Sequence, residues 1–299
     1  YHGMVRNLFD DAHGFNAGDA PPDVCYQLDI GESSGEPDDK CVTDDYVHAH
    51  IAEGVDRFSN LELAQAEWLG LMHDGLIAVH GVAATAFDLG KLAAAGSGLV
   101  WSPRNSVHLY RAGADLAAAQ RLGVRIALAP DWPATGGVNL LSELKCADEL
   151  NAAEYGGLFT DQELVEMSTA IPAAMVGLDD RIGRLEDGYY ADFIVVEGDP
   201  LTPYRALIEA TPQELLATFV GGELVAGTED LTAATQGAGH DCDPLELVGG
   251  DQTVTRYVCF ADSGYDRTVD SLVQEVFDAY DGATYGGGLY LKQCRTSFD

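Results

Sequence analysis

The sequence predicts an α/β fold: part of a TIM-type (β/α) barrel, followed by a small β-rich tail domain and a C-terminal α+β extension. Short apolar runs alternate with segments of helical spacing between residues 46 and 131, a pattern typical of a parallel sheet with right-handed crossovers. Three of these runs end in chemically active side chains, at His50, His80 and Asp131. In barrels of parallel strands, catalytic side chains lie at the carboxyl ends of the strands.

At the first of these strand ends, the spacing of the residues would bring a metal ligand close to a side chain that can carry protons. An apolar run carries His48 and His50, and Glu53 follows three residues after His50. A neutral imidazole can bind a divalent metal, and a carboxylate beside it can pass protons to and from an attacking water. The structural alternative is that one histidine ring is packed and the other is solvated.

The other two strand ends change the balance between these alternatives. The run Leu76–His80 stops at a histidine followed by Gly81, and the run Val124–Asp131 stops at an aspartate. Taken singly, His80 could be a satisfied histidine near the core, and Asp131 could cap a following turn. Three successive strands that end in His, His and Asp predict instead one rim of one site.

Four segments are expected along the chain. They are an irregular segment with one strand (residues 1–45), a (β/α) barrel half that carries the site (46–180), a small β-rich domain (181–227) and a C-terminal extension (228–299). Helices are predicted over residues 60–72, 85–95, 115–122, 139–150, 160–176 with a break at Pro172, 212–216 and 269–280. Further strands are predicted over residues 24–30, 99–103, 193–196, 218–225 and 253–260.

The charge balance excludes some classes of partner. Forty-nine acidic residues against sixteen basic ones give a net charge of −33, which argues against nucleic-acid binding and against docking on anionic membranes. The sequence shows neither a transmembrane run nor a signal-peptide pattern. A solvated, salt-tolerant surface explains the acidic residues. The alternative is a calcium site near Asp241, Asp243 and Glu246, although no calcium loop of the 12-residue type is present.

The cysteines favour an oxidising, extracytoplasmic compartment. None of the six has Cys-x-x-Cys spacing, which excludes zinc-ribbon and thioredoxin-like sites. Cys25 and Cys41 bracket a polar loop that a disulfide would close. The C-terminal extension holds Cys242, Cys259 and Cys294. Two of these could pair, whereas Cys146 is expected to be a buried thiol in the helix over residues 139–150.

Several motifs occur in a fixed order. They are His50–Glu53, His80–Gly81, Ser102–Tyr110, Ala129–Asp131, Asn139–Leu144, Gly183–Val196 and Phe219–Val225. Taken together, residues 45–227 or so resemble the C-terminal half to two-thirds of a metal-dependent enzyme of the amidohydrolase superfamily, closest to its deaminase and chlorohydrolase branch. Two departures stand out: Asn105-Ser106 inverts the family's Ser-Asn pair, and Ala129-Pro130 replaces its Gly-Thr.

The resemblance implies metal-assisted hydrolysis of carbon–nitrogen (non-peptide) or related bonds in a small-molecule substrate. One divalent metal, zinc or iron, would be held by His50 and Asp131 together with two histidines that are not in this sequence. By the same resemblance, Asp131 would take a proton from the attacking water. Glu53 would carry protons to the substrate, and His80 would polarise the group under attack.

The family's metal site begins with a His-x-His on the first barrel strand. We therefore expect that about three strands of the barrel are missing and that the chain as given binds metal weakly and lacks catalytic competence. Two other classes stay open. One is a non-catalytic remnant of the fold that serves as a binding module, and the other is a binding protein whose acidic surface is the functional feature. The protein could also form a homo-oligomer.

Overall fold

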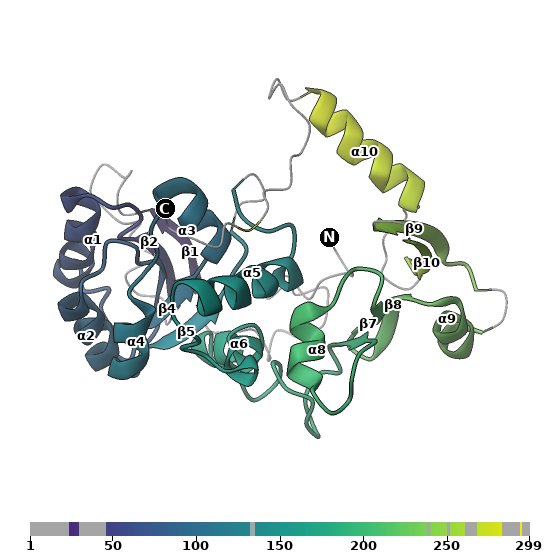
Figure 1. Cartoon of the computed structure of the whole chain (residues 1–299), viewed down its shortest axis with the longest axis horizontal. Coiled ribbons are helices and arrows are strands. Elements are labelled where there is room, and N and C mark those ends of the chain that lie inside the picture. Colours follow the sequence, from purple (N-terminus) through teal and green to yellow (C-terminus); the bar gives the residue numbers. More distant parts are fainter. Residues whose placement is uncertain are drawn as a thin grey trace. The chain divides into compact units, whose positions relative to one another are not determined.

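The computed structural model describes residues 24–29, 46–131, 135–237, 240–249, 252–260, 268–282 and 294. The chain divides into two compact units. The parallel-sheet unit comprises residues 21–184 and 291–299, and the antiparallel-sheet unit comprises residues 1–20 and 185–290. Figure 1 labels helices and strands of both units where there is room.

The first unit is built on a parallel sheet of five strands in the order β1-β2-β3-β4-β5. These strands are β1 (Val24–Asp29), β2 (Tyr46–Ile51), β3 (Leu76–His80), β4 (Gly98–Trp101) and β5 (Arg125–Leu128). The predicted α/β architecture with a parallel sheet is confirmed. Since β1 pairs with β2, the boundary expected at residue 45 falls inside the sheet. Because all five strands are parallel, their carboxyl ends meet at one edge.

Helices follow the strands along the chain. They are α1 (Arg57–Trp68), α2 (Ala86–Ala95), α3 (Pro103–Tyr110), α4 (Leu116–Leu122), α5 (Leu140–Ala153), α6 (Asp161–Glu166) and α7 (Ala170–Met175). Figure 1 shows α1, α2 and α4 gathered along one side of the sheet, and α2 packs against α4. Ile77, Val100 and Ala127 from three neighbouring strands form a buried cluster with Met175 of α7. This cluster fixes the strands beneath the edge where the candidate residues lie.

Capping residues and prolines explain why several helices begin or end at other residues than predicted. The first helix begins at Arg57 rather than residue 60, because the Asp56 carboxylate accepts the N–H groups of Phe58 and Ser59. Pro103 was assigned to the end of a strand but begins α3, where its missing N–H costs no helical bond. The break expected at Pro172 lies earlier, between α6 and α7. Pro172 itself sits in the first turn of α7.

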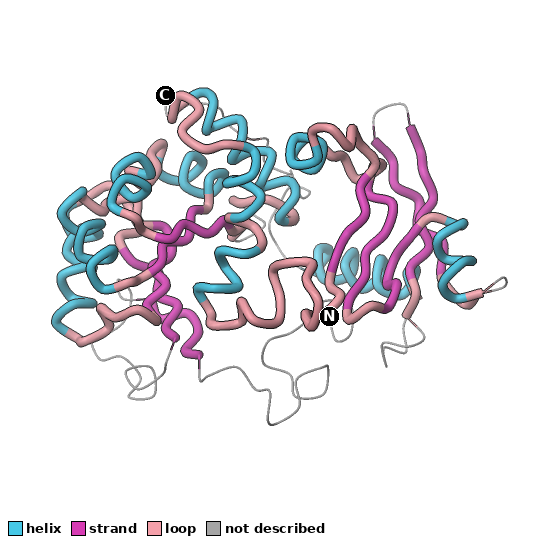
Figure 2. Tube along the Cα trace, turned by 90° about the horizontal axis from the view of Figure 1, so that it is seen from below, coloured by secondary structure: helices cyan, strands magenta, loops and turns pink. Residues whose placement is uncertain are grey.

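The second unit is built on a sheet in the order β6-β7-β8-β10-β9, and all its pairs are antiparallel. Its elements are β6 (Phe193–Val196), α8 (Pro203–Glu209), β7 (Leu215–Val220), β8 (Glu223–Gly227), α9 (Glu229–Gln236), β9 (Asp243–Gly249), β10 (Gln252–Val258) and α10 (Val269–Gly282). The strands of this sheet run side by side in Figure 2. Because β10 pairs with β8, the expected C-terminal extension continues the sheet of the β-rich domain.

Two expectations for this unit were wrong. The run over residues 218–225 is a hairpin rather than one strand, since Gly221 and Gly222 take φ values of 61° and 85°, as a tight hairpin turn requires. The helix placed at residues 212–216 lies instead at α8, which starts at Pro203. Directly after Gly227 the chain forms α9, capped by Thr228.

One of the acidic residues near Cys242 has a local structural role. The Asp243 carboxylate accepts the N–H of Val269 at 2.8 Å, at the start of α10. Within the described ranges, Asp241, Asp243 and Glu246 do not form a converging group of metal ligands, so the calcium alternative gains no support. None of the described helices combines the length and apolar character needed to cross a bilayer.

Two disulfides lie among the described residues. Cys242 pairs with Cys259, which confirms that two cysteines of the C-terminal extension bond to each other. Cys146 pairs with Cys294 across 148 residues of sequence, so the expectation of a buried thiol at Cys146 was wrong. The local sequence carries no signal of this pairing, because a position on a helix does not show that a distant segment returns to it. The expected pair of Cys25 and Cys41 lies outside the residues whose side chains are described.

Removing the long-range cross-link should weaken the parallel-sheet unit. A Cys146→Ser/Cys294→Ser variant should lose about 2–4 kcal/mol of unfolding free energy, because the cross-link restricts the unfolded chain. All three tryptophans lie in residues 21–184, so tryptophan fluorescence in urea reports on this unit. The matched Cys242→Ser/Cys259→Ser variant should leave that urea midpoint nearly unchanged. An equal midpoint for the wild type and the first variant would contradict the expectation.

Candidate metal and active site

The end of β2 carries two of the candidate residues. Val47, Ala49 and Ile51 are fully buried, so the alternation of the strand places the half-buried His48 and His50 together on its other face. After Ile51 the chain turns sharply, with φ 55° at Ala52 and φ 146° at Gly54. The turn brings Glu53 Oε2 to 3.4 Å from His50 Nδ1.

Contacts from α1 hold this turn in place. The Glu62 carboxylate accepts the N–H of Ala52 at 2.7 Å. A Cβ at position 54 would lie 2.3 Å from Ser59 Oγ, so the close approach of α1 as well as the backbone angle requires glycine there. Glu53 therefore sits on a turn that is fixed on both sides.

His80 reaches the same point from the neighbouring strand. It pairs in register with Ile51, so strict alternation would send its side chain to the face opposite His50. Its φ of 76° departs from the extended conformation, and its Nε2 lies 3.2 Å from His50 Nδ1 and 3.4 Å from Glu53 Oε2. The His80 side chain is fully buried. A non-glycine residue at such an angle costs about 1–3 kcal/mol and is found preferentially at functional sites.

Asp131 lies beyond β5 and also has a left-handed backbone, with φ 60°. Its Oδ2 is 3.9 Å from His80 Nε2, and its side chain is 17% exposed. Ala129, two residues before it, still donates its N–H to Trp101 O of β4, so the approach to Asp131 remains attached to the sheet. The structure thus brings His50, Glu53, His80 and Asp131 together at the carboxyl edge of adjacent parallel strands.

Tyr110 belongs to this group although the sequence pattern gave it no role. It is the last residue of α3, and its hydroxyl donates a hydrogen bond of 2.8 Å to Glu53 Oε1. The two residues are 57 positions apart, and only the packing of α3 brings them together. The only sequence signal was the Ser102–Tyr110 motif, which places a chain segment after β4 without identifying which side chain returns to the site.

The electrostatics keep Glu53 ionised and Tyr110 neutral. The hydrogen bond to His50 lowers the pKa of Glu53, and the nearby His80 and the Tyr110 hydroxyl lower it further against the opposing effect of burial. Burial and the contact with Glu53 raise the pKa of Tyr110. Burial, with the neighbouring His50, lowers the pKa of His48, which favours a neutral ring.

Three donor atoms have a spacing suited to a divalent metal. His50 Nδ1, Glu53 Oε2 and His80 Nε2 form a triangle with edges of 3.2, 3.4 and 3.4 Å. Tetrahedral ligands about 2.0–2.1 Å from zinc lie about 3.3–3.4 Å from one another. In the part of the chain that the structure describes, this is the one group of three or more His, Cys, Asp or Glu side chains that converges in this way. The residues present therefore fit a small divalent ion.

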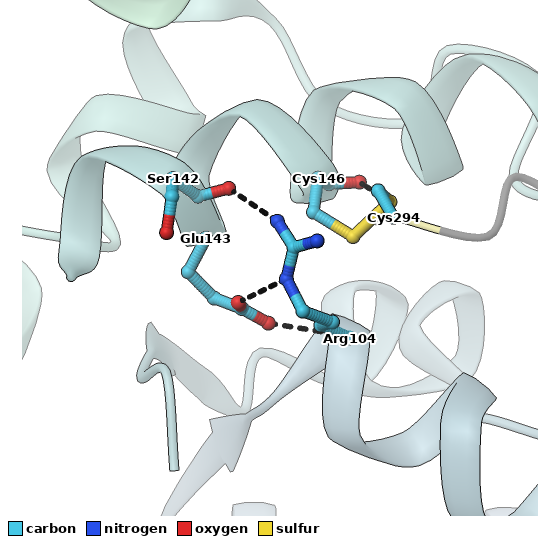
Figure 3. The surroundings of a disulfide bond; sticks show 5 residues. All are labelled: Arg104, Ser142, Glu143, Cys146 and Cys294. Carbon is cyan, nitrogen blue, oxygen red and sulfur yellow. Dashed lines mark hydrogen bonds and ion pairs between the residues drawn. A yellow bond between two sulfur atoms is a disulfide. The ribbon is translucent and has the colours of Figure 1, made fainter. Parts of the chain in front are cut away.

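A buried ion pair joins α3 to α5, as Figure 3 shows. The Glu143 carboxylate of α5 accepts the backbone N–H of Arg104 at 2.7 Å and its Nε at 3.3 Å, and the guanidinium donates to Ser142 O at 2.9 Å. Asn105, one of the inverted pair, donates to Thr135 Oγ1 at 2.8 Å. These bonds join the start of α3 to α5 and to the segment that follows Asp131.

Two other histidines do not join the cluster. His73 accepts the N–H of Gly75 at 3.1 Å in the turn before β3, which is a local structural role. His108 lies on α3 and is partly exposed. Neither is part of the group of converging donors in the described residues.

Comparison with known proteins places these motifs in a family. The sequence profile of the amidohydrolase family matches residues 42–225. A 5-methylthioadenosine/S-adenosylhomocysteine deaminase of Halobacterium salinarum is 32% identical over 196 residues, covering 60% of this chain and 45% of that protein. The corresponding deaminase of Pyrococcus furiosus is 29% identical, covering 52% of this chain and 39% of that protein. The chain thus spans less than half the length of these curated relatives.

Solved structures show a similar fold. An adenosine deaminase from Xanthomonas campestris with bound zinc is 25% identical, with a TM-score of 0.54 over 60% of this chain and 45% of that one. The guanine deaminase of E. coli is 21% identical, with a TM-score of 0.53 over 60% of this chain and 47% of that one. The second likeness concerns the fold alone.

Stability should depend on pH through Glu143. Burial raises its pKa to about 7 from an ordinary 4.5, although the bonds from Arg104 oppose the shift. As pH rises from about 4.5 to 7, the unfolded chain releases this proton before the folded chain does, so the folded state loses stability. The loss is present in full above pH 7 and absent below 4.5.

A Glu143→Gln variant isolates this effect from the other carboxylates. The unfolding free energy of the wild type minus that of the variant should fall by up to roughly 3 kcal/mol between pH 4.5 and 7. Urea unfolding followed by tryptophan fluorescence at several pH values measures it. A difference that stays constant across this window would mean that Glu143 does not titrate there.

Proposed function

The chain belongs to the amidohydrolase family, and on that premise we propose that it forms part of a metal-dependent hydrolase that breaks carbon–nitrogen (non-peptide) bonds of small molecules, as deaminases do. The named deaminase relatives support this class of reaction. The observation that carries the proposal is the convergence of His50, Glu53 and His80, with Asp131 beside them, at one edge of the sheet.

In this proposal His50 and Asp131 bind one divalent metal. Zinc is the preferred ion, supported by the zinc in the similar adenosine deaminase structure, and iron is the alternative. Imidazole nitrogen and carboxylate oxygen are both ordinary zinc ligands. The triangle of His50, Glu53 and His80 offers a second donor set, which shares His50 with the first. His50 is therefore the residue on which metal binding most depends.

When bound, the metal supplies a water whose pKa is lowered towards neutrality. The protein's own groups move the protons. Asp131 accepts a proton from the attacking water, and Glu53, which is ionised and faces both imidazoles, carries protons to the substrate nitrogen or leaving group. His80, held rigid by burial, donates a hydrogen bond to the substrate group under attack and so draws electron density from it.

We place the reaction in an oxidising, extracytoplasmic compartment. The two disulfides among the described residues support this location, because such bonds are rare in the cytosol of most organisms. The substrate is proposed only as a class, a small molecule with an amine or amide leaving group. The acidic surface, with net charge −33, supports a partner that is not a nucleic acid.

Metal binding should depend on His50 and not on His48. A His50→Asn variant should bind zinc at least about tenfold more weakly, because a ligand is lost. The matched His48→Asn variant changes a histidine two residues earlier on the same face of β2 and should bind zinc as the wild type does. Equilibrium dialysis in high salt, which suppresses binding to surface carboxylates, measures both affinities. Equal affinities for all three proteins would remove His50 from the metal site.

Turnover should depend on Glu53 without loss of metal. In the complete enzyme of which this chain is proposed to form part, a Glu53→Gln variant should keep its zinc content and lose about 10²-fold or more in turnover, the usual contribution of general acid–base catalysis. The assay uses that enzyme with a panel of aminopurines and amides, and metal content is measured by mass spectrometry. Loss of zinc would make Glu53 a ligand instead, whereas wild-type turnover would exclude it from the mechanism.

A further inference from the structure

We infer that Tyr110 is a positioning residue for Glu53, holding one carboxylate oxygen so that the other faces His50 and His80. The inference rests on the proposed function, in which Glu53 carries protons. It assigns a specific task to a side chain from a distant helix.

The two oxygens of Glu53 have different partners. Oε1 accepts the Tyr110 hydroxyl at 2.8 Å, whereas Oε2 lies 3.4 Å from His50 Nδ1 and 3.4 Å from His80 Nε2. The terminal torsion of a glutamate side chain has broad minima, so an unrestrained carboxylate rotates easily. A short hydrogen bond to one oxygen removes that freedom. The Tyr110 bond is the shortest of these contacts, and it holds Oε1 so that Oε2 is left to face the imidazoles.

Tyr110 is itself held by a rigid element. At its start, α3 is joined to α5 through Arg104 and Glu143, and to the segment after Asp131 through Asn105. Val107, one turn before Tyr110, is 1% exposed. The helix ends at Tyr110, and Arg111 takes φ 52° directly after it. A hydroxyl on such an anchored helix end can position a catalytic group more precisely than one on a loop.

The chemistry of the two groups sets the roles of donor and acceptor in this contact. A phenol is protonated near neutral pH and can donate, whereas an ionised carboxylate can only accept. The bond therefore runs from the Tyr110 hydroxyl to Glu53 Oε1.

The test compares Tyr110→Phe, which removes a single oxygen atom, with the wild type, both in the complete enzyme of which this chain is proposed to form part. Turnover should fall by about tenfold with KM changed by less than about twofold, because a misplaced catalytic group slows the chemical step more than it weakens binding. Zinc content should be unchanged. Tyr155→Phe is the matched control: that partly buried tyrosine donates to Ala114 O at 3.3 Å rather than to Glu53, and loss of its hydroxyl should leave turnover near that of the wild type.

Two further readouts separate positioning from general structural support. In a Glu53→Gln background, Tyr110→Phe should cause no additional loss of turnover, because the two residues act through one step. In metal-free crystals, Tyr110→Phe should release Glu53, so that Oε2 no longer lies near both imidazoles. If Tyr110→Phe folds poorly by circular dichroism, 4-fluorophenylalanine in place of Tyr110 fills the same volume without donating a hydrogen bond.

Different results would overturn the proton-carrying role of Glu53 and the positioning role of Tyr110. Wild-type turnover in Glu53→Gln would overturn the proposed role of Glu53, and with it the basis of this inference. Loss of turnover in Glu53→Gln, together with wild-type turnover and an unmoved Glu53 in Tyr110→Phe, would overturn the positioning role alone. An additional loss from Tyr110→Phe in the Glu53→Gln background would also overturn it, since the hydroxyl would then act by another route.

Discussion

The parallel pairing of β2, β3, β4 and β5 is the constraint on which the candidate site depends. In register, His50 of β2 lies beside Val79, which lies beside Val100 and then Ala127, so the strands end at nearly the same level. Each strand ends in, or is followed by, a residue or helix that contributes to the site. A slip of one residue between two strands would exchange the faces of all their side chains. The buried apolar runs that specify this register therefore also specify which polar groups meet.

Strand pairing alone would not assemble the cluster, because alternation sends neighbouring residues to opposite faces. His80 is in register with the fully buried Ile51, yet its imidazole meets that of His50. The left-handed backbone at His80, repeated at Ala52 and Asp131, redirects these side chains at the edge of the sheet. Each such residue costs about 1–3 kcal/mol, which the packed sheet must offset. Strain concentrated in this way is typical of functional sites, and it accords with the metal-centred function proposed for the chain.

Features that follow from local sequence patterns could be predicted, whereas features that depend on contacts between segments far apart in the sequence were missed. Apolar runs ending in His50, His80 and Asp131 were sufficient to place these residues at one edge, because parallel strands share their direction. Their catalytic and ligand roles stay predictions. Tyr110 could not be assigned, since its meeting with Glu53 depends on the packing of α3, a helix whose first residue was predicted as strand. The Cys146–Cys294 disulfide and the joining of β10 to β8 were missed for the same reason: both depend on segments far apart in the sequence.

The most direct test of the account is the position of a bound metal in a crystal of this protein grown with zinc. Anomalous scattering measured at the zinc absorption edge identifies the ion independently of the surrounding density. If these strand ends form a metal centre, a strong peak is expected about 2.0–2.2 Å from a ring nitrogen of His50, with the Asp131 carboxylate as a second ligand. No peak beside His50, or zinc bound only among the acidic side chains of the surface, would contradict the claim that these strand ends form a metal centre.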